Sequence, residues 1–272
     1  MSGRVRVGAV EYLNTKPLIC DLEELAPEAD LVLDLPSRLA DQLAAGALDV
    51  ALIPVVEYFR GRNYTLLPDM AIASRGPVLS VTVFSRSPWG EMKSLALDEG
   101  SRTSAALTQV LLKRYGAQPK LLPLPMDQEA EEVNADAVLL IGDRAMRAAL
   151  PGFAYSYDLG QEWHDWTGLP FVYAVWAVRP DAELGEVALA LAKAKQRGLS
   201  RIAQIAYQEA QRLELDAAFC RRYLTNIIRF DLGPSELAGL RRFHELTAEL
   251  SLAPKETRLE FYRTPTLIAE PV

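Results

Sequence analysis

The fold of this chain is decided by residues 5–18, which read Val5-Arg6-Val7-Gly8-Ala9-Val10-Glu11-Tyr12-Leu13-Asn14-Thr15-Lys16-Pro17-Leu18. The first six predict a β-strand, and a helix is predicted to begin near Pro17. The first N–H groups of a helix have no partner within it, so a strand that leads into a helix through polar residues suits anion binding. Asn14 can donate and accept hydrogen bonds, and Lys16 supplies positive charge. Alternatively, Asn14 or Thr15 simply caps the helix.

The alternation of strand and helix continues beyond this stretch. Residues 31–35 and 49–53 have strand-like apolar runs, and Pro36 and Ser37 begin a helix between them. A β-α-β-α-β order predicts a mainly parallel sheet with helices on its faces. Ligands of such sheets bind outside the carboxyl ends of the strands, where Asn14 lies.

A second alternation follows from residue 95, after strand candidates at 66–73 and 78–85. Its expected elements are strand 95–97, helix 103–115, strand 120–124, helix 127–133 and strand 137–141. Two alternating halves predict an α/β protein of two lobes. Long strand-like runs near residues 82 and 174 are candidates for the crossings between them.

The C-terminal third has a helical pattern. The expected helices cover residues 184–197, residues 202–213, the stripe Phe219, Tyr223 and Ile227, and a last helix from Pro234. Apolar stripes of this kind are typical of core packing. An interaction module formed by these helices is therefore a weak alternative.

Composition and charge narrow the function classes. The chain has 272 residues, half of them hydrophobic, and a net charge of −7, which argues against a nucleic-acid binder but not against a small anionic ligand. No apolar run approaches the ~20 residues of a membrane span, and no secretory pattern precedes the first strand. Cys20 and Cys220 lie far apart, without metal-ligand spacing. We expect a cytoplasmic protein with reduced thiols.

Residues 100–104, Gly-Ser-Arg-Thr-Ser, lie between a predicted strand and an amphipathic helix. The hydroxyls of Thr103 and Ser104, with the exposed N–H groups of the helix start, would bind a carboxylate, and Arg102 could add charge. Serine and threonine are also common helix caps, so capping is the competing interpretation.

Two further positions suggest a site. Gly142 ends an apolar strand and lets the backbone approach a ligand closely; Asp143 beside it could be a base, a cap or an orienting group. Ser80 follows a Gly-Pro turn, and we expect its hydroxyl at the mouth of a cleft. His164 and His244 share no metal-like spacing. Nothing in the pattern requires a metal, a nucleotide cofactor or a covalent nucleophile.

These motifs together resemble the chorismate dehydratases, the first enzymes of the futalosine route to menaquinone. The resemblance covers residues 7–18, 76–80, 101–104, 141–143 and 166–176, in the family's order. It implies the two-lobed fold of type II periplasmic binding proteins, with a cleft between the lobes. One lobe would comprise residues 1–84 plus 175–272, and the other, inserted between them, residues 85–174.

The resemblance also implies a reaction, the removal of water from chorismate to give 3-[(1-carboxyvinyl)oxy]benzoate without a cofactor. Asn14 and Ser80 correspond to residues of substrate binding and catalysis, and Thr103 and Ser104 would hold a carboxylate. We expect the enolpyruvyl carboxylate of the substrate to take the proton, with Asp143 as the rival base.

Two competing functions share the same fold. A non-catalytic solute-binding protein would normally carry a secretion signal or a lipid-anchoring cysteine. The sister enzyme 1,4-dihydroxy-6-naphthoate synthase would be expected to use a histidine, yet neither His164 nor His244 lies in a motif. The motifs at residues 12–18 and 101–104 favour the dehydratase.

Overall fold

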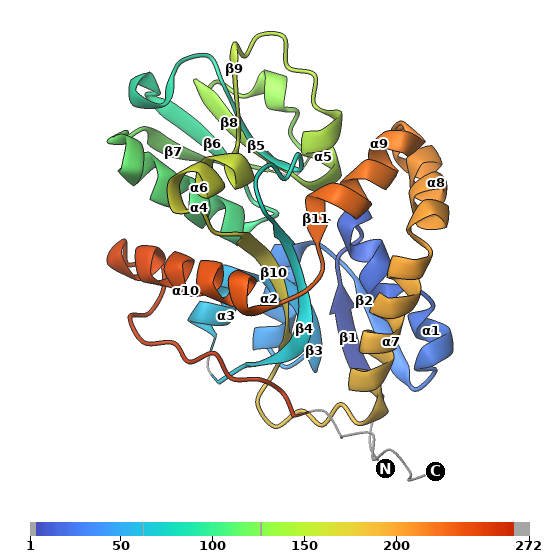
Figure 1. Cartoon of the computed structure of the whole chain (residues 1–272). Coiled ribbons are helices and arrows are strands. Elements are labelled where there is room, and N and C mark those ends of the chain that lie inside the picture. The colour runs from blue at the N-terminus through green and yellow to red at the C-terminus, as the bar shows by residue number, and fades with distance from the viewer. Residues whose placement is uncertain (1–3, 62, 126, 264–272) are drawn as a thin grey trace.

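The computed structural model describes residues 4–61, 63–125 and 127–263. Two β-sheets lie one above the other in Figure 1, each covered by helices, and the C-terminal helices flank the lower sheet. The predicted α/β class is confirmed.

The lower sheet contains the strands nearest the N-terminus. Its order is β11 (Ile228–Arg229), β4 (Thr65–Ser74), β10 (Phe171–Val178), β3 (Val50–Pro54), β1 (Val5–Ala9) and β2 (Ala29–Leu33). β1 pairs in parallel with β2 and β3, as the alternation predicts. β10 is antiparallel to both of its neighbours, because it enters this sheet as the chain returns from the upper one. The sheet is therefore mixed, and the mainly parallel prediction holds only for its N-terminal strands.

The upper sheet repeats this arrangement with five strands. Its order is β7 (Lys120–Leu124), β6 (Ser94–Asp98), β8 (Ala137–Ile141), β5 (Val81–Ser85) and β9 (Tyr155–Asp158). β6 pairs in parallel with β7 and β8, whereas β5 is antiparallel to β8 and β9.

The strand pairing bears on where the chain crosses between lobes. All of β5 belongs to the upper sheet and all of β10 to the lower one, so boundaries after residues 84 and 174 would divide two strands. Because ladder hydrogen bonds hold a strand within one sheet, we propose that the crossings lie at residues 75–80 and 168–170. The boundaries of the two lobes stay a prediction.

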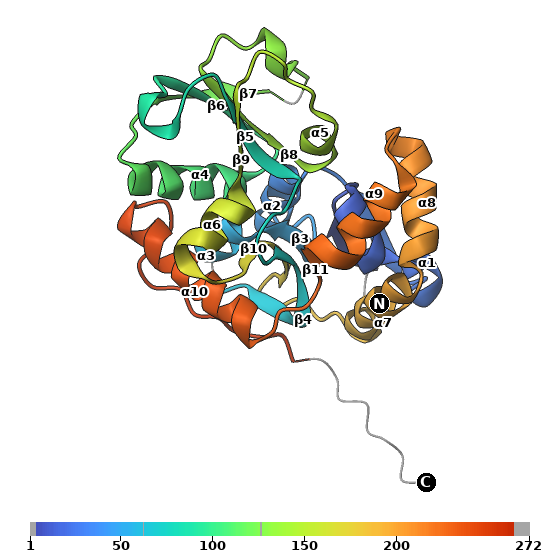
Figure 2. The ribbon, with the colours of Figure 1, turned by 45° about the horizontal axis from the view of Figure 1, so that its top comes forward.

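The helices follow the predicted pattern in most places. They are α1 (Leu22–Leu25), α2 (Pro36–Ala44), α3 (Val55–Arg60), α4 (Arg102–Tyr115), α5 (Gly142–Arg147), α6 (Leu159–Thr167), α7 (Glu186–Ser200), α8 (Ile202–Leu213), α9 (Ala217–Arg222) and α10 (Pro234–Glu249). Figure 2 shows α10 running beneath α6, and it packs against α4 and β10. Helix α10 thereby contacts elements of both lobes.

Two predicted helices form only in part. The first α-helix begins at Leu22 rather than near Pro17, because a 3₁₀-helix spans Leu13–Ile19 with Pro17 inside it and proline cannot donate a helical hydrogen bond. Of the helix predicted at 127–133, only a 3₁₀ turn at Ala130–Glu132 forms. That acidic segment has few apolar side chains to bury, so tertiary packing gives its helix little support.

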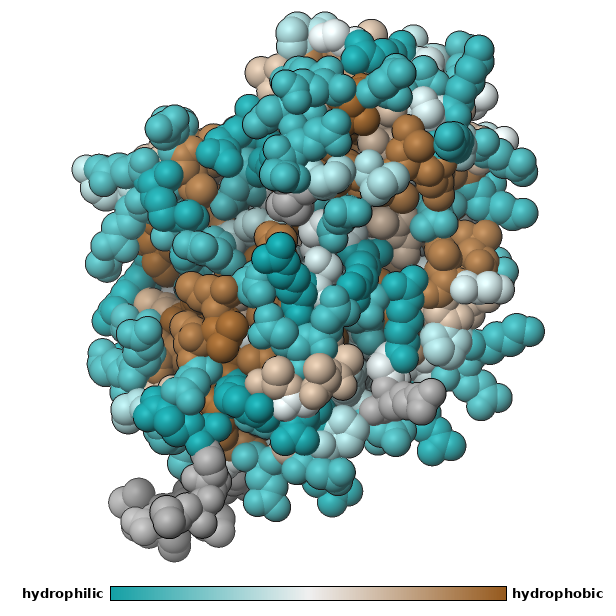
Figure 3. Space-filling model, turned by 180° about the vertical axis from the view of Figure 1, so that it is seen from behind, coloured by the Kyte–Doolittle hydropathy of each residue, from teal (hydrophilic) through white to brown (hydrophobic). Residues whose placement is uncertain are grey.

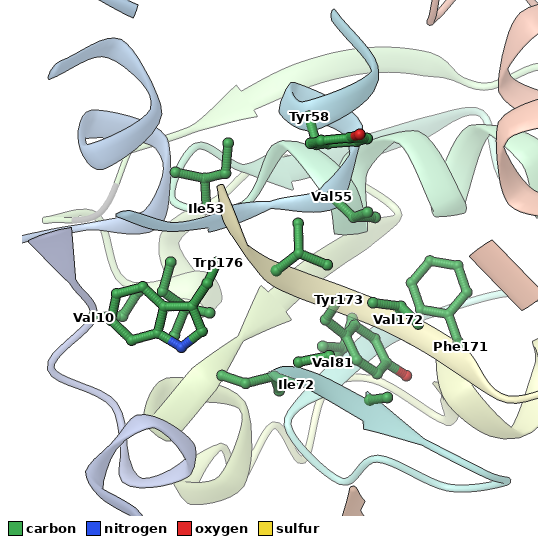
Figure 4. Packing of buried hydrophobic residues seen from close by; sticks show 14 of the residues in the cluster. Val10, Ile53, Val55, Tyr58, Ile72, Val81, Phe171, Val172, Tyr173 and Trp176 are labelled. Atoms are coloured by element: carbon green, nitrogen blue, oxygen red, sulfur yellow. The ribbon is translucent and has the colours of Figure 1, made fainter. Parts of the chain in front are cut away.

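The lower lobe is built around a dense apolar core. Figure 4 shows Trp176 of β10 beside Val10, with Ile53 of β3 and Ile72 of β4 nearby. Trp176 is fully buried, as expected for a packing residue. On the face seen in Figure 3, apolar side chains are interrupted by hydrophilic ones.

Candidate active site

A small cavity lies where the carboxyl ends of several strands meet. Asn14 follows β1, Ser101 follows β6 and Gly142 follows β8, and all three line the cavity. Its other polar lining residues are Tyr12, Thr15, Ser80, Ser104 and Tyr173. The two sheets therefore contribute to one site, at the place where parallel strands bind ligands.

The structure brings four predicted site residues together. Asn14 and Ser80, the predicted catalytic pair, and Ser104 and Gly142, predicted to bind substrate, all line this cavity. The Gly142 N–H donates to the Ser80 carbonyl oxygen (2.7 Å), so two segments distant in sequence are joined at the site. These assignments remain proposals about function.

The other four predicted residues lie outside the cavity lining. Arg102 pairs with Asp41 at 2.8 Å, and the buried Thr103 hydroxyl oxygen accepts the Val56 N–H (3.1 Å). Lys16 lies 3.8 Å from a Glu209 carboxylate oxygen on α8. None of the three side chains is directed to the cavity.

Asp143 also lies outside this lining. Its Oδ1 accepts the Leu13 N–H (3.2 Å), and its Oδ2 lies 3.8 Å from Arg212. Burial raises the pKa of Asp143, against the effects of that hydrogen bond and of Arg212. The carboxylate thus ties the 3₁₀-helix to α5 and borders a second, outer cleft.

One residue at the site was not predicted from the sequence. Asn14 Nδ2 donates to the Tyr223 hydroxyl (3.1 Å), and the Tyr223 hydroxyl donates to Ser80 Oγ (2.8 Å). Tyr223 is fully buried. The sequence places it on an apolar stripe with Phe219 and Ile227, and this spacing cannot distinguish a packing tyrosine from one that meets a site.

Ser80 is held in place by its own loop. The Asp158 carboxylate accepts the N–H groups of Val78 and Leu79, at 3.0 and 2.7 Å, and also caps α6. Leu79 adopts a left-handed backbone with φ of 63°, which is uncommon for a non-glycine residue. These contacts overcome the strain and fix the backbone just before Ser80.

The start of α4 supplies an anion-binding element. Ser101 caps this 14-residue helix by accepting the Ser104 N–H (3.3 Å), and the two hydroxyl oxygens lie 2.9 Å apart. The first turn carries no acidic residue. A helix N-terminus with free N–H groups and hydroxyls favours a carboxylate.

The cavity is small, and a larger cleft adjoins it. Its volume is about 60 Å³, well below the ~300–1,000 Å³ of typical ligand pockets. A ligand can therefore enter only if the two lobes move apart or the Tyr12 side chain moves aside. The outer cleft measures about 900 Å³ and is bordered by Arg144, Arg147 and Arg212. Tyr12 lines both spaces, and its ring packs on Gly142, where an added Cβ would lie 3.0 Å from the ring. Tyr12 therefore separates the two, together with Val10 and Ile141, which also line both.

The buried carboxyl group of Asp98 lies near Tyr12. Among the described residues, Asp98 Oδ2 and Tyr12 Oη have no hydrogen-bond partner, and Arg144 Nη1 lies 3.7 Å from the Asp98 carboxylate. Burial raises the pKa of Asp98, and its contacts with Gly100 and Arg144 lower it. Burial has the larger effect, so the pKa rises from 3.8 to about 6.

This pKa predicts a pH-dependent stability. Between about pH 4 and pH 6 the folded protein binds more protons at Asp98 than the unfolded chain, so its contribution to stability falls as pH rises. Asp98→Asn removes the titration. We compare the unfolding free energy of the variant with that of the unmodified protein at about pH 4.5 and about pH 7.5. The difference should shift by about 2 kcal/mol in favour of the variant from the lower to the higher pH. Denaturant unfolding of both proteins at the two pH values measures this, and an equal difference at both would contradict it.

In the described part of the chain, no cluster of three or more histidine, cysteine, aspartate or glutamate residues is placed to hold a metal. His164 Nδ1 lies 3.2 Å from the Leu169 carbonyl oxygen, and His244 Nε2 lies 2.8 Å from that of Pro254; neither lines the cavity. None of the described helices is both long and apolar enough to span a bilayer.

Two sheets with a cavity between them define the class of this protein. Its fold is similar to that of protein AF1704 from Archaeoglobus fulgidus, with a TM-score of 0.72, 18% identity, and coverage of 92% of this chain and 99% of that one. The periplasmic aliphatic sulphonate binding protein SsuA from Escherichia coli gives a TM-score of 0.67 at 18% identity, covering 100% and 96%. The chain thus has the periplasmic-binding-protein fold, as expected.

The family follows from sequence comparison. Residues 5–249 match the family described as menaquinone biosynthesis. The chain is 34% identical over 259 residues to the chorismate dehydratase of Thermus thermophilus, covering 88% of this chain and 93% of that protein. It is 28% identical over 253 residues to the chorismate dehydratase of Campylobacter jejuni, covering 90% and 99%. The chain belongs to the menaquinone biosynthesis family, and the resemblance inferred from its motifs is confirmed.

Proposed function

We propose that this protein is a chorismate dehydratase, which removes water from chorismate to give 3-[(1-carboxyvinyl)oxy]benzoate. The observation that carries the proposal is the cavity in which Asn14 and Ser80 are joined through Tyr223. It lies in a chain whose curated relatives are chorismate dehydratases.

The chemistry needs orientation more than reactive side chains. A ring proton and the ring hydroxyl group leave chorismate together as water, and the ring becomes aromatic, so the products are strongly favoured. The enzyme has to hold a flexible dianion in the geometry of this elimination rather than of a competing rearrangement. Ser101, Ser104 and the α4 N-terminus would hold one carboxylate. Asn14 and Ser80 would hydrogen-bond the reacting part of the substrate.

The proton acceptor is proposed to be the substrate itself. Among the described residues, the cavity lining contains no carboxylate, imidazole or amine side chain. The enolpyruvyl carboxylate of chorismate, bound in the same cavity, could take the ring proton and pass it to the departing hydroxyl group, which then leaves as water.

Replacement of the rival base tests this assignment. We expect Asp143→Asn to retain kcat within about threefold, because Asp143 borders the outer cleft and an amide oxygen can still accept the Leu13 N–H. Steady-state kinetics with chorismate measure it. A loss of about 10²-fold or more, the size expected for removal of a general base, would make Asp143 the base.

A product assay tests the proposed function. The purified protein is incubated with chorismate, and the products are separated by liquid chromatography with mass detection. We expect a species lighter than chorismate by one water. Unchanged chorismate with a clear thermal shift would replace this function by ligand binding alone, and unchanged chorismate without a shift would reject chorismate as the substrate.

We also propose a cytoplasmic location and a small-molecule partner, chorismate. The two cysteines, Cys20 and Cys220, are not joined in a disulfide, which suits a reducing compartment. Fractionation of cells that express the tagged protein tests the location.

A further inference from the structure

We propose that Tyr223 is a positioning residue that directs the Ser80 hydroxyl proton into the cavity. The inference rests on the proposed function and deepens it. It states that a residue from the C-terminal helical region orients the Ser80 hydroxyl for its role in the reaction.

The direction follows from which atoms donate. Tyr223 accepts from Asn14 Nδ2 and uses its single O–H to donate to Ser80 Oγ. An oxygen that accepts this hydrogen bond keeps its own proton for another partner. Ser80 Oγ donates to none of the described residues, and Ser80 lines the cavity. The chain of hydrogen bonds thus presents Ser80 to a ligand as a donor.

Tyr223 is held by its packing and by the local backbone. Its side chain is fully buried, and its ring lies parallel to that of Phe219 at 6.4 Å between centroids. Tyr223 begins a π-helical turn, Tyr223–Ile227, between α9 and β11. Such turns are rare and often occur at functional sites.

Tyr223 is suited to donate rather than to act as a base. Burial raises its pKa, and this effect exceeds the opposite effects of the hydrogen bonds with Ser80 and Asn14. The phenol therefore stays protonated at neutral pH. Because Ser80 lies before β5 of the upper sheet and Asn14 follows β1 of the lower one, Tyr223 also fixes their separation.

Tyr223→Phe tests the proposal, with Tyr58→Phe as its matched control. Tyr58 is equally buried, and its hydroxyl donates to the Arg258 carbonyl oxygen (2.8 Å) away from the cavity. We expect Tyr223→Phe to lower kcat for chorismate about 10- to 100-fold with a smaller change in KM, as for the loss of a buried hydrogen bond at the site. Tyr58→Phe should leave both near normal. Equal kinetics of the two variants would overturn the proposal.

A double-mutant cycle separates positioning from a structural role. If Tyr223 acts through Ser80, adding Tyr223→Phe to Ser80→Ala should lower kcat by less than about threefold further. The same 10- to 100-fold loss in both backgrounds would mean that Tyr223 acts independently of Ser80.

A structural readout keeps this inference distinct from the proposed function. In crystal structures of the unmodified protein and of Tyr223→Phe, we expect Ser80 to adopt one rotamer in the former and to change or divide its rotamer in the latter. An unchanged single rotamer would overturn the positioning role. If the unmodified protein fails to convert chorismate, the proposed function fails, whereas this comparison still tests Tyr223.

Discussion

Ser80→Ala is expected to lower kcat/KM for chorismate by about 10²- to 10³-fold, the usual effect of removing one preorganised hydrogen-bond donor from an active site. Ser80 is only 2% exposed and lines the cavity. The substitution removes one hydroxyl and adds no volume, so the fold should persist. Steady-state kinetics with product detection measure the loss, and Asn14→Ala should give a loss of similar size.

Ser85→Ala is the matched control for this prediction. Ser85 lies on β5, five residues after Ser80, and its buried hydroxyl donates to the Ser87 carbonyl oxygen (2.6 Å) rather than to the site. It should retain near-normal kcat/KM. If Ser80→Ala behaves like Ser85→Ala, the cavity is not where the reaction occurs.

Gly198→Ala is expected to have the largest effect on stability. Gly198 lies in α7, and a Cβ added there would be 2.0 Å from the Pro17 carbonyl oxygen and 2.5 Å from the Pro17 Cα. Backbone atoms cannot move aside as a flexible side chain can, so α7 and the 3₁₀-helix would separate. We expect a loss of about 3 kcal/mol or more, the upper range for overpacking. Because the same 3₁₀-helix carries Asn14, activity should fall as well.

Thermal unfolding measures this effect, with Gly90→Ala as the control. Among the described residues, no atom beyond its sequence neighbours lies within 4 Å of a Cβ added at Gly90, so that variant should unfold at a normal temperature. The expected loss corresponds to a Tm lowered by about 6–12 °C for a chain of this size. A Gly198→Ala protein that unfolds within about 2 °C of the Gly90→Ala protein would show that α7 is not packed on the 3₁₀-helix in this way.

Much of the fold is predictable because it follows from local pattern. Helix 202–213 agrees with the structure at both ends, and the runs at 120–124 and 137–141 are strands. Short elements were missed, among them α3, α5 and β9. Each has six residues or fewer, too few for a periodic pattern to emerge above the background of loop sequence.

The site is only partly predictable, for a different reason. Asn14 and Ser80 lie in motifs that resemble a known family, so the sequence singles them out as candidates, and both line the cavity. The orientation of Arg102 depends on a partner distant in sequence, because Asp41 and Glu57 draw its guanidinium away from the cavity. Tyr223 reaches the site only because a π-helical turn brings it there. Such tertiary contacts leave no local signal.

A crystal structure of Ser80→Ala with bound chorismate tests most directly where the reaction occurs. Crystals of the variant are soaked with chorismate briefly and frozen, because its turnover is slowed but not abolished, and bound chorismate or its dehydrated product marks the same site. We expect the ring between Asn14 and residue 80, with one carboxylate at Ser101 and Ser104 and the lobes or Tyr12 displaced to make room. Chorismate bound instead in the outer cleft, against Arg144 and Arg212, would contradict the assignment of the inner cavity as the active site.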